Sequence, residues 1–126
     1  MRAMEKISPE AMAAYRRTAR LRAAADTKRR RQRLEHALEV ARRASALLRQ
    51  RFQAEQVVIF GSLLRPEHFS ERSDVDLAVR GLADQDFLRA VAAVTSLDPE
   101  ITIDLVAIEE ASPSLRQRIE HEGMEI

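Results

Sequence analysis

Two aspartates separated by a single residue are the clearest chemical feature of the sequence. Asp74 and Asp76 belong to the run Asp-Val-Asp-Leu-Ala-Val, which is typical of a strand. Because side chains in a strand alternate between faces, both carboxylates should project from one face, and Val75 and Leu77 from the other. Neighbouring carboxylates repel each other and resist desolvation. A divalent cation would compensate for this cost, so the pair indicates a metal site.

A third aspartate, Asp104, lies inside another alternating apolar run, residues 101–106, which predicts a further strand. A lone carboxylate in an apolar strand is costly unless it is paired or binds a metal. From the residues alone, a partly exposed aspartate on an edge strand is the simpler interpretation.

A glycine and a serine follow a short apolar run, residues 56–60, which is typical of a buried strand. Gly61 allows unusual backbone dihedral angles and a close approach of other groups. Ser62 would begin a helix, whose first backbone N–H groups form an anion site. Without the aspartate pair this would be an ordinary turn. With the pair, a phosphate site is the better interpretation.

The motif Gly61-Ser62, Arg65 and Ser73-Asp74-Val75-Asp76-Leu77 resembles the signature of the polymerase-β-type nucleotidyltransferases, above all their minimal, MNT-type members. The resemblance covers roughly residues 53–126. It implies an α/β (α+β) fold, in which helices pack on one face of a small mixed sheet. A helical N-terminal extension would precede this sheet.

The sequence departs from the family pattern in the loop after the Gly-Ser turn. Leu63, Leu64 and Pro66 stand where the family usually has small residues and a glycine. The spacing from Ser62 to Asp74 is also about one residue longer than the commonest form, in a loop that should tolerate such changes.

The resemblance implies a role for each motif residue. Gly61 and Ser62 would bind the β- and γ-phosphates of a nucleoside triphosphate. Arg65 would meet phosphate, although a surface arginine is an equally good interpretation. Ser73 would hydrogen-bond a carboxylate or a phosphate. Asp104 matches the family's third carboxylate, on the strand beside the aspartate pair.

The three carboxylates together imply a mechanism. Asp74, Asp76 and Asp104 would hold two Mg²⁺ ions, as in other two-metal sites. A hydroxyl, deprotonated with Asp104 as general base, would attack the α-phosphorus of ATP in line. A nucleoside monophosphate, most simply AMP, would be transferred and pyrophosphate released.

Two helices are predicted before the first strand. Residues 9–25 are rich in alanine and arginine, with Ser8 as N-cap and Pro9 in the first turn. Asp26-Thr27 should break this helix or cap the next one. Residues 28–52 carry an apolar stripe at helical spacing, and its C-terminal half should pack on the sheet.

Two further helices are predicted after the aspartate pair. Residues 84–97 have apolar residues at helical spacing, with Asp84 as N-cap. Ser112-Pro113 should start the last helix, and Gly123 should end it.

The charge is divided along the chain of 126 residues. Residues 1–56 hold fifteen Lys and Arg against six Asp and Glu, whereas residues 57–126 hold six against fourteen. We therefore expect a basic helical extension, residues 1–52, and a minimal nucleotidyltransferase domain, residues 53–126. The absence of cysteine excludes disulfides and sulfur-based zinc sites. No signal peptide or membrane span is evident, which predicts a soluble, cytoplasmic protein.

The acceptor of the nucleotide is implied only by the resemblance. MNT-type proteins are commonly antitoxins of HEPN-type ribonuclease toxins, and some adenylylate a tyrosine of the toxin. Two alternatives stay open: an antitoxin that acts by binding alone, and a nucleic-acid-binding module that uses the basic run Lys28–Arg33. A solvated helix end also explains that run, and oligomer formation is open as well.

Overall fold

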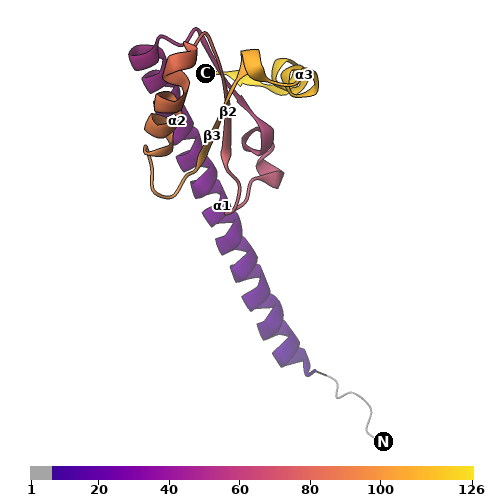
Figure 1. Cartoon of the computed structure of the whole chain (residues 1–126). Helices are drawn as coiled ribbons and strands as arrows, with labels where there is room; N and C mark the ends of the chain where they lie inside the picture. Colours follow the sequence, from indigo (N-terminus) through magenta and orange to yellow (C-terminus); the bar gives the residue numbers. More distant parts are fainter. Residues whose placement is uncertain (1–6) are drawn as a thin grey trace, which may run out of the picture.

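A computed structural model describes residues 7–126, and its longest element is helix α1, Pro9–Phe52, of 44 residues (Figure 1). Ser8 caps its start as predicted, because the Ser8 hydroxyl accepts a 3.1 Å hydrogen bond from the Ala11 N–H. At the other end, Gln53 adopts a left-handed conformation with φ of 57°, and its N–H bonds to the Leu48 carbonyl. The helix therefore has a defined cap at both ends.

The predicted interruption at Asp26-Thr27 is wrong, because α1 continues through both residues. The Thr27 hydroxyl donates to the Ala23 carbonyl at 2.9 Å, and the Asp26 carboxylate pairs with the Arg29 guanidinium one turn later. Both polar side chains are thus satisfied along the helix itself. The surrounding alanines and arginines are strong helix formers, and no proline or glycine interrupts them.

The rest of the chain forms a four-stranded mixed sheet in the order β3-β2-β1-β4. β1 (Gln56–Phe60) pairs antiparallel with β2 (Val75–Arg80), and β2 pairs parallel with β3 (Ile103–Ala107). β3 begins two residues later than the predicted strand. A short β4 (Met124–Glu125) pairs antiparallel with β1 and was not predicted, because two residues are too short for an alternation signal.

Helix α2 (Phe87–Thr95) crosses over between the parallel strands β2 and β3. The predicted helix over residues 84–97 is therefore confirmed only in its middle. Residues 84–86 form a 3₁₀ turn, and Asp84 does not cap the helix. The Asp86 carboxylate instead pairs with the Arg89 guanidinium on the next turn.

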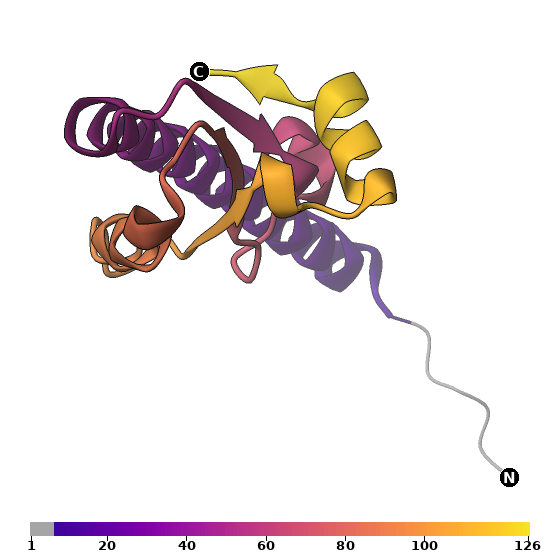
Figure 2. The ribbon, with the colours of Figure 1, turned by 45° about the horizontal axis from the view of Figure 1, so that its top comes forward.

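Helix α3 (Pro113–Glu122) begins and ends as predicted. The Ser112 hydroxyl accepts a 3.2 Å hydrogen bond from the Leu115 N–H, and Gly123 follows the last turn. α3 packs on the opposite face of the sheet from α1 and α2 (Figure 2).

The mixed α+β fold is confirmed, but the expectation that helices cover only one face is wrong. β1 is apolar on both sides. Val57 and Ile59 pack in the core beneath α1, whereas Val58 and Phe60 pack with Ile119 of α3. Because both faces of this strand bury apolar side chains, both need a helix as cover.

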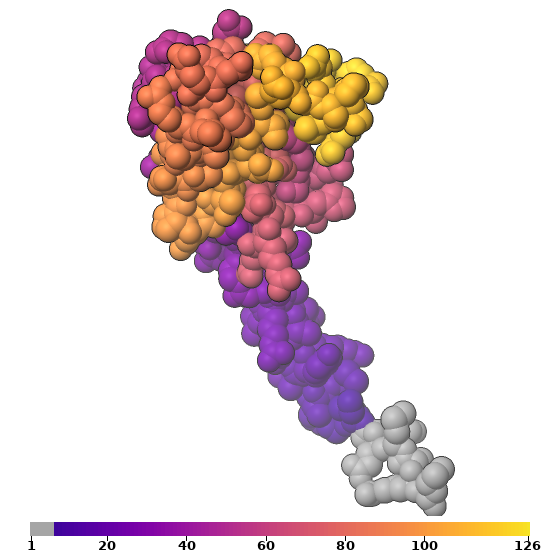
Figure 3. All heavy atoms as spheres, in the orientation of Figure 1, coloured from indigo at the N-terminus to yellow at the C-terminus, as the bar shows by residue number. Residues whose placement is uncertain are grey.

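α1 has an exposed N-terminal half and a buried C-terminal half (Figure 3). From Ile7 to Gln32, every side chain is exposed except the half-buried Met12. The C-terminal half confirms the predicted packing on the sheet. It contributes to the main core Ala37, Val40, Ala41, Ala44, Leu48 and Phe52.

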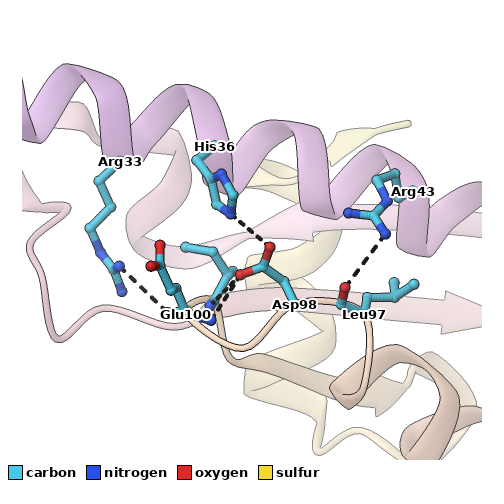
Figure 4. A network of polar contacts seen from close by, with 7 residues as sticks. Arg33, His36, Arg43, Leu97, Asp98 and Glu100 are labelled. Carbon is cyan, nitrogen blue, oxygen red and sulfur yellow. Dashed lines mark hydrogen bonds and ion pairs between the residues drawn. The ribbon is translucent and has the colours of Figure 1, made fainter.

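Polar contacts fasten the middle of α1 to the segment that leads into β3 (Figure 4). His36 Nε2 lies 2.8 Å from Asp98 Oδ2, and Arg33 Nη1 donates to the Glu100 carbonyl at 3.5 Å. Asp98 Oδ1 accepts the N–H groups of Glu100 and Ile101, at 2.8 and 3.1 Å. These hydrogen bonds, the one from the Glu100 N–H foremost, lower the pKa of Asp98.

No helix within residues 7–126 combines the length and the apolar character that a membrane span requires.

Candidate active site

The strand register brings two of the predicted carboxylates together. In the parallel pair of β2 and β3, Asp76 lies directly opposite Asp104. The residues on either side of each aspartate, Val75 and Leu77 in β2 and Ile103 and Leu105 in β3, point into the main core. Both aspartates therefore project from the other face, which α3 partly covers. Asp104 is thus a near neighbour of Asp76 across the β2–β3 pair. The register therefore places two carboxylates side by side on one face of the sheet.

Asp76 lies in the negative field of the other two predicted carboxylates. The pKa of Asp76 is raised, first by burial and then by the negative charges of Asp104 and Asp74. Asp76 is half-buried, whereas Asp74, just before β2, and Asp104 on the edge strand are exposed. The site is therefore a concentration of negative charge with an open side toward solvent.

Gly61 packs directly against the Asp76 carboxylate. Its φ is +78°, a left-handed conformation that side chains disfavour, and a Cβ there would lie 2.3 Å from Asp76 Oδ2. The residues that follow form a four-residue 3₁₀ turn, Gly61–Leu64, rather than a long helix. A glycine is required at this position for two independent reasons, conformation and space.

The other predicted phosphate ligands lie around this turn. Ser62 is half-exposed within the 3₁₀ turn, next to Gly61. Arg65 follows the turn and pairs with Glu122 of α3, with 3.1 Å between Arg65 Nη2 and Glu122 Oε2. Because both partners are about half exposed, this ion pair is weak and easily exchanged for another anion.

Ser73 has a different position from the one expected. Its hydroxyl accepts the Ser70 N–H at 3.0 Å and lies 3.5 Å from the His68 carbonyl. The hydroxyl thus shapes the loop that leads into β2 and bonds no carboxylate.

A cation that sequence reasoning missed reaches the site from α3. The positive charge of Arg118 opposes the rise in the pKa of Asp76, so its guanidinium is electrostatically coupled to that carboxylate. The buried neighbour Ile119 fixes this stretch of α3 against the sheet. Arg118 was missed because the predicted fold placed no helix specifically on the face that carries the aspartates.

The carboxylates of Asp74, Asp76 and Asp104 are suitable ligands for magnesium, although in their present positions they do not surround an ion. Carboxylate oxygens are the ligands that Mg²⁺ prefers, and a cation would relieve the repulsion that raises the pKa of Asp76. Across the part of the chain described, however, no three Asp, Glu or His side chains converge closely enough to form a ready metal cage. The carboxylates would have to rotate toward one another around the ion.

Comparison with protein families identifies the fold that carries this site. Residues 43–126 match the family model described as polymerase beta, nucleotidyltransferase. The match includes the Gly-Ser turn, all three aspartates and the buried end of α1. No protein of curated function matches the sequence significantly.

Several solved structures with a similar fold are toxin–antitoxin complexes. A chain of such a complex with AMP-PNP superposes with a TM-score of 0.56 and 24% identity, over 68% of this chain and 70% of that chain. A chain of the tri-AMPylated Shewanella oneidensis HEPN toxin in complex with MNT antitoxin gives 0.53 and 22%, over 71% and 70%. A chain of an MntA–HepT complex gives 0.52 and 22%, over 70% and 69%.

Proposed function

Because this chain belongs to the polymerase β nucleotidyltransferase family, we propose that it transfers a nucleoside monophosphate, AMP from ATP, to a hydroxyl group of a partner protein. The observation that carries the proposal is the position of Asp76 opposite Asp104 on neighbouring strands, with Gly61 packed against the Asp76 carboxylate. A fold held for purely structural reasons would gain nothing from two like charges placed side by side.

We expect Asp74, Asp76 and Asp104 to hold two Mg²⁺ ions between them. Asp76 would be the central ligand of this set, since the negative charges of Asp74 and Asp104 both act on its carboxylate. The bound ions would neutralise charge on the triphosphate and acidify the attacking hydroxyl. Removing Mg²⁺ should therefore abolish transfer.

The protein residues would bind and orient the two reactants. The Gly61–Ser62 turn, Arg65 and Arg118 would contact the phosphates. The Asp104 carboxylate would accept the proton of the acceptor hydroxyl as its oxygen attacks the α-phosphorus. A new oxygen–phosphorus bond forms, the bond to the β-phosphate oxygen breaks, and pyrophosphate leaves.

We propose that the acceptor is a HEPN-type toxin, which the modification would neutralise. The similar structures support this, because one of them is described as a tri-AMPylated HEPN toxin bound to an MNT antitoxin. Exposure of Asp74 and Asp104 also supports a macromolecular acceptor, since no part of residues 7–126 closes over these two carboxylates.

A transfer assay tests the proposal. The full chain is incubated with Mg²⁺, ATP labelled at the α-phosphate and a HEPN-type toxin. We expect label on the partner with the wild type, and a loss of at least about 100-fold with Asp104→Asn or Asp76→Asn. Asp84→Asn is the matched control, because it removes an exposed aspartate outside the site. Transfer by Asp104→Asn at the wild-type rate would exclude this mechanism.

Neutralisation by binding alone is the second candidate. It is favoured by the open arrangement of the three carboxylates and by the engagement of Arg65 with Glu122. In that case the chain would suppress the toxin without labelling it, and the Asp104→Asn variant would suppress it equally well.

A further inference from the structure

The N-terminal half of α1 is an exposed and strongly basic rod. We call residues 9–33 the stalk. It carries nine Lys and Arg against two acidic residues, Glu10 and Asp26, a net charge of +7. Figure 3 shows the stalk projecting away from the body of the molecule. The basic residues are Arg16, Arg17, Arg20, Arg22, Lys28, Arg29, Arg30, Arg31 and Arg33.

Most of these charges are not used inside the molecule. Arg29 pairs with Asp26, and Arg33 donates to the Ser70 carbonyl at 3.2 Å, which anchors the base of the stalk. Within residues 7–126, the other seven basic side chains make no ion pair and no side-chain hydrogen bond. Like charges crowded on one helix repel each other, so a polyanion would stabilise the stalk.

The stalk lacks the surface that a protein partner would need. Its exposed large apolar side chains are Tyr15 and Leu21, each 70% exposed. Their spacing of six residues places them roughly 120° apart around a helix, so they form no stripe. Because protein interfaces bury an apolar core, an acidic protein would have little to pack against.

The basic side chains surround the helix instead of lining one side. At helical spacing, Arg16, Arg20 and Arg31 point to one side, and Arg22, Arg29 and Arg33 to the opposite side. A flat acidic surface would contact only one of these sides. The major groove of a duplex has a phosphate backbone on both walls, so it would neutralise both.

The dimensions also match a duplex. Twenty-five helical residues form a rod roughly 37 Å long. The B-form major groove is about 12 Å wide and admits an α-helix. The major groove of an RNA duplex is deep and narrow, and side chains cannot read it.

The root of the stalk, where α1 meets the β1–β2 loop, offers a further positively charged binding site. Arg29 and Arg30 line a hollow of about 320 Å³ together with Ser70 and Arg72 of the β1–β2 loop. Asp26 and Glu71 also line it, so its charge is partly balanced. Three guanidinium groups in one hollow at the root would hold a phosphate where the duplex meets the body.

We propose that the stalk is a docking arm for double-helical DNA, lying in the major groove with its arginines on both phosphate walls. This activity is separate from nucleotide transfer by the aspartates. The acidic body would be repelled by the same phosphates, so the duplex would contact the stalk and its root alone.

The test measures binding of the full chain to a fluorescent 20-base-pair DNA duplex by anisotropy, from 50 to 200 mM salt. Arg16, Arg17, Arg20 and Arg22 are replaced together by glutamine, which keeps helix propensity. The matched control replaces the same number of exposed arginines on the body, Arg42, Arg51, Arg89 and Arg116. Circular dichroism verifies that both variants keep their helix content.

We expect wild-type affinity to fall steeply with salt, because each neutralised phosphate adds about 0.9 to the logarithmic slope. The stalk variant should bind at least about tenfold more weakly at 100 mM salt and lose up to about four in slope. The body variant and Asp76→Asn should bind like the wild type. The Asp76→Asn result separates this proposal from the proposed transfer activity.

Four results would overturn the proposal. The first is wild-type binding by the stalk variant, and the second is absence of DNA binding at 50 mM salt. The third is equal binding of an RNA duplex, which would exclude placement in the major groove. The fourth is stalk-dependent binding of polyglutamate but not of DNA, which would identify an acidic protein as the occupant.

Discussion

At the scale of single residues, the contact between Gly61 and Asp76 determines the shape of the site. The carboxylate occupies the space where any other residue would carry its Cβ, and the backbone of Gly61 has a positive φ. Gly61 and Asp76, fifteen residues apart in sequence, therefore belong to one packed unit. A change in either one should displace the other.

Replacing Gly61 by alanine should damage both stability and transfer. The left-handed conformation costs about 1–2 kcal/mol for a residue with a Cβ, and the clash would push the Asp76 carboxylate away. Chemical denaturation and the labelling assay measure the two effects.

Gly81→Ala is the matched control, because Gly81 has a φ of +88° at the opposite end of β2. A Cβ there meets the flexible side chain of Glu55, so stability should fall while transfer persists. Full transfer by Gly61→Ala would show that the turn does not position Asp76.

The raised pKa of Asp76 predicts how stability depends on pH. Its causes are burial, then the charges of Asp104 and Asp74. Because the folded state holds the proton more tightly than the unfolded state, this group favours folding most below the ordinary carboxyl pKa of about 3.9. That contribution is lost as the pH rises through the raised value.

Asp76→Asn should therefore gain stability relative to the wild type between pH 4 and pH 7 when Mg²⁺ is chelated. Urea denaturation at several pH values measures the difference. Added Mg²⁺ should then stabilise the wild type at pH 7 but not the variant, because ligand binding favours the folded state. A difference that shrinks toward pH 7 would contradict the assigned repulsion.

At the scale of elements, α1 serves two purposes in one continuous helix. Its C-terminal half covers the sheet and completes the core, whereas the stalk has no core contacts. The network of Arg33, His36 and Asp98 fixes α1 where it leaves the body. The stalk is therefore held by its root and by its own helix propensity.

Thr27→Pro should break the stalk without unfolding the body. Proline inside a helix costs about 3 kcal/mol, but here the lost turn lies outside the core. Helix content measured by circular dichroism should fall, while the melting temperature of the body changes little.

Ala44→Pro is the comparison variant, because Ala44 is fully buried in the core half of the same helix. It should unfold the protein. A large fall in melting temperature for Thr27→Pro would show that the stalk contributes to the core.

At the scale of the whole molecule, the division of charge coincides with a division of space. The basic residues lie mainly on α1, and the acidic residues on the body with the carboxylate site. The two meet at the end of the sheet where β2 begins, because Arg33 bonds the Ser70 carbonyl four residues before Asp74. A partner held along the stalk would thus lie beside the loop that leads into the site (Figure 1).

The local elements of this protein could be predicted from the order of its residues. Caps at Ser8 and Ser112, the strands on either side of the Gly-Ser turn, and the alternation around Asp74 and Asp76 depend on residues within a few positions of each other. Such short-range preferences can be recognised in a single sequence. The family motif supplied Asp104, whose own surroundings in sequence favoured an ordinary edge residue.

Features that depend on segments far apart in the chain became visible only in the folded molecule. The register that pairs Asp76 with Asp104, the position of α3 on the aspartate face and the reach of Arg118 all arise from packing between strands and helices. The predicted break in α1 was also wrong. Asp26 and Thr27 are common at helix caps, but they also fit inside a helix when their side chains bond to groups of that same helix, as they do here. Local preference leaves such alternatives nearly equal in free energy, and the contacts of the whole fold select between them.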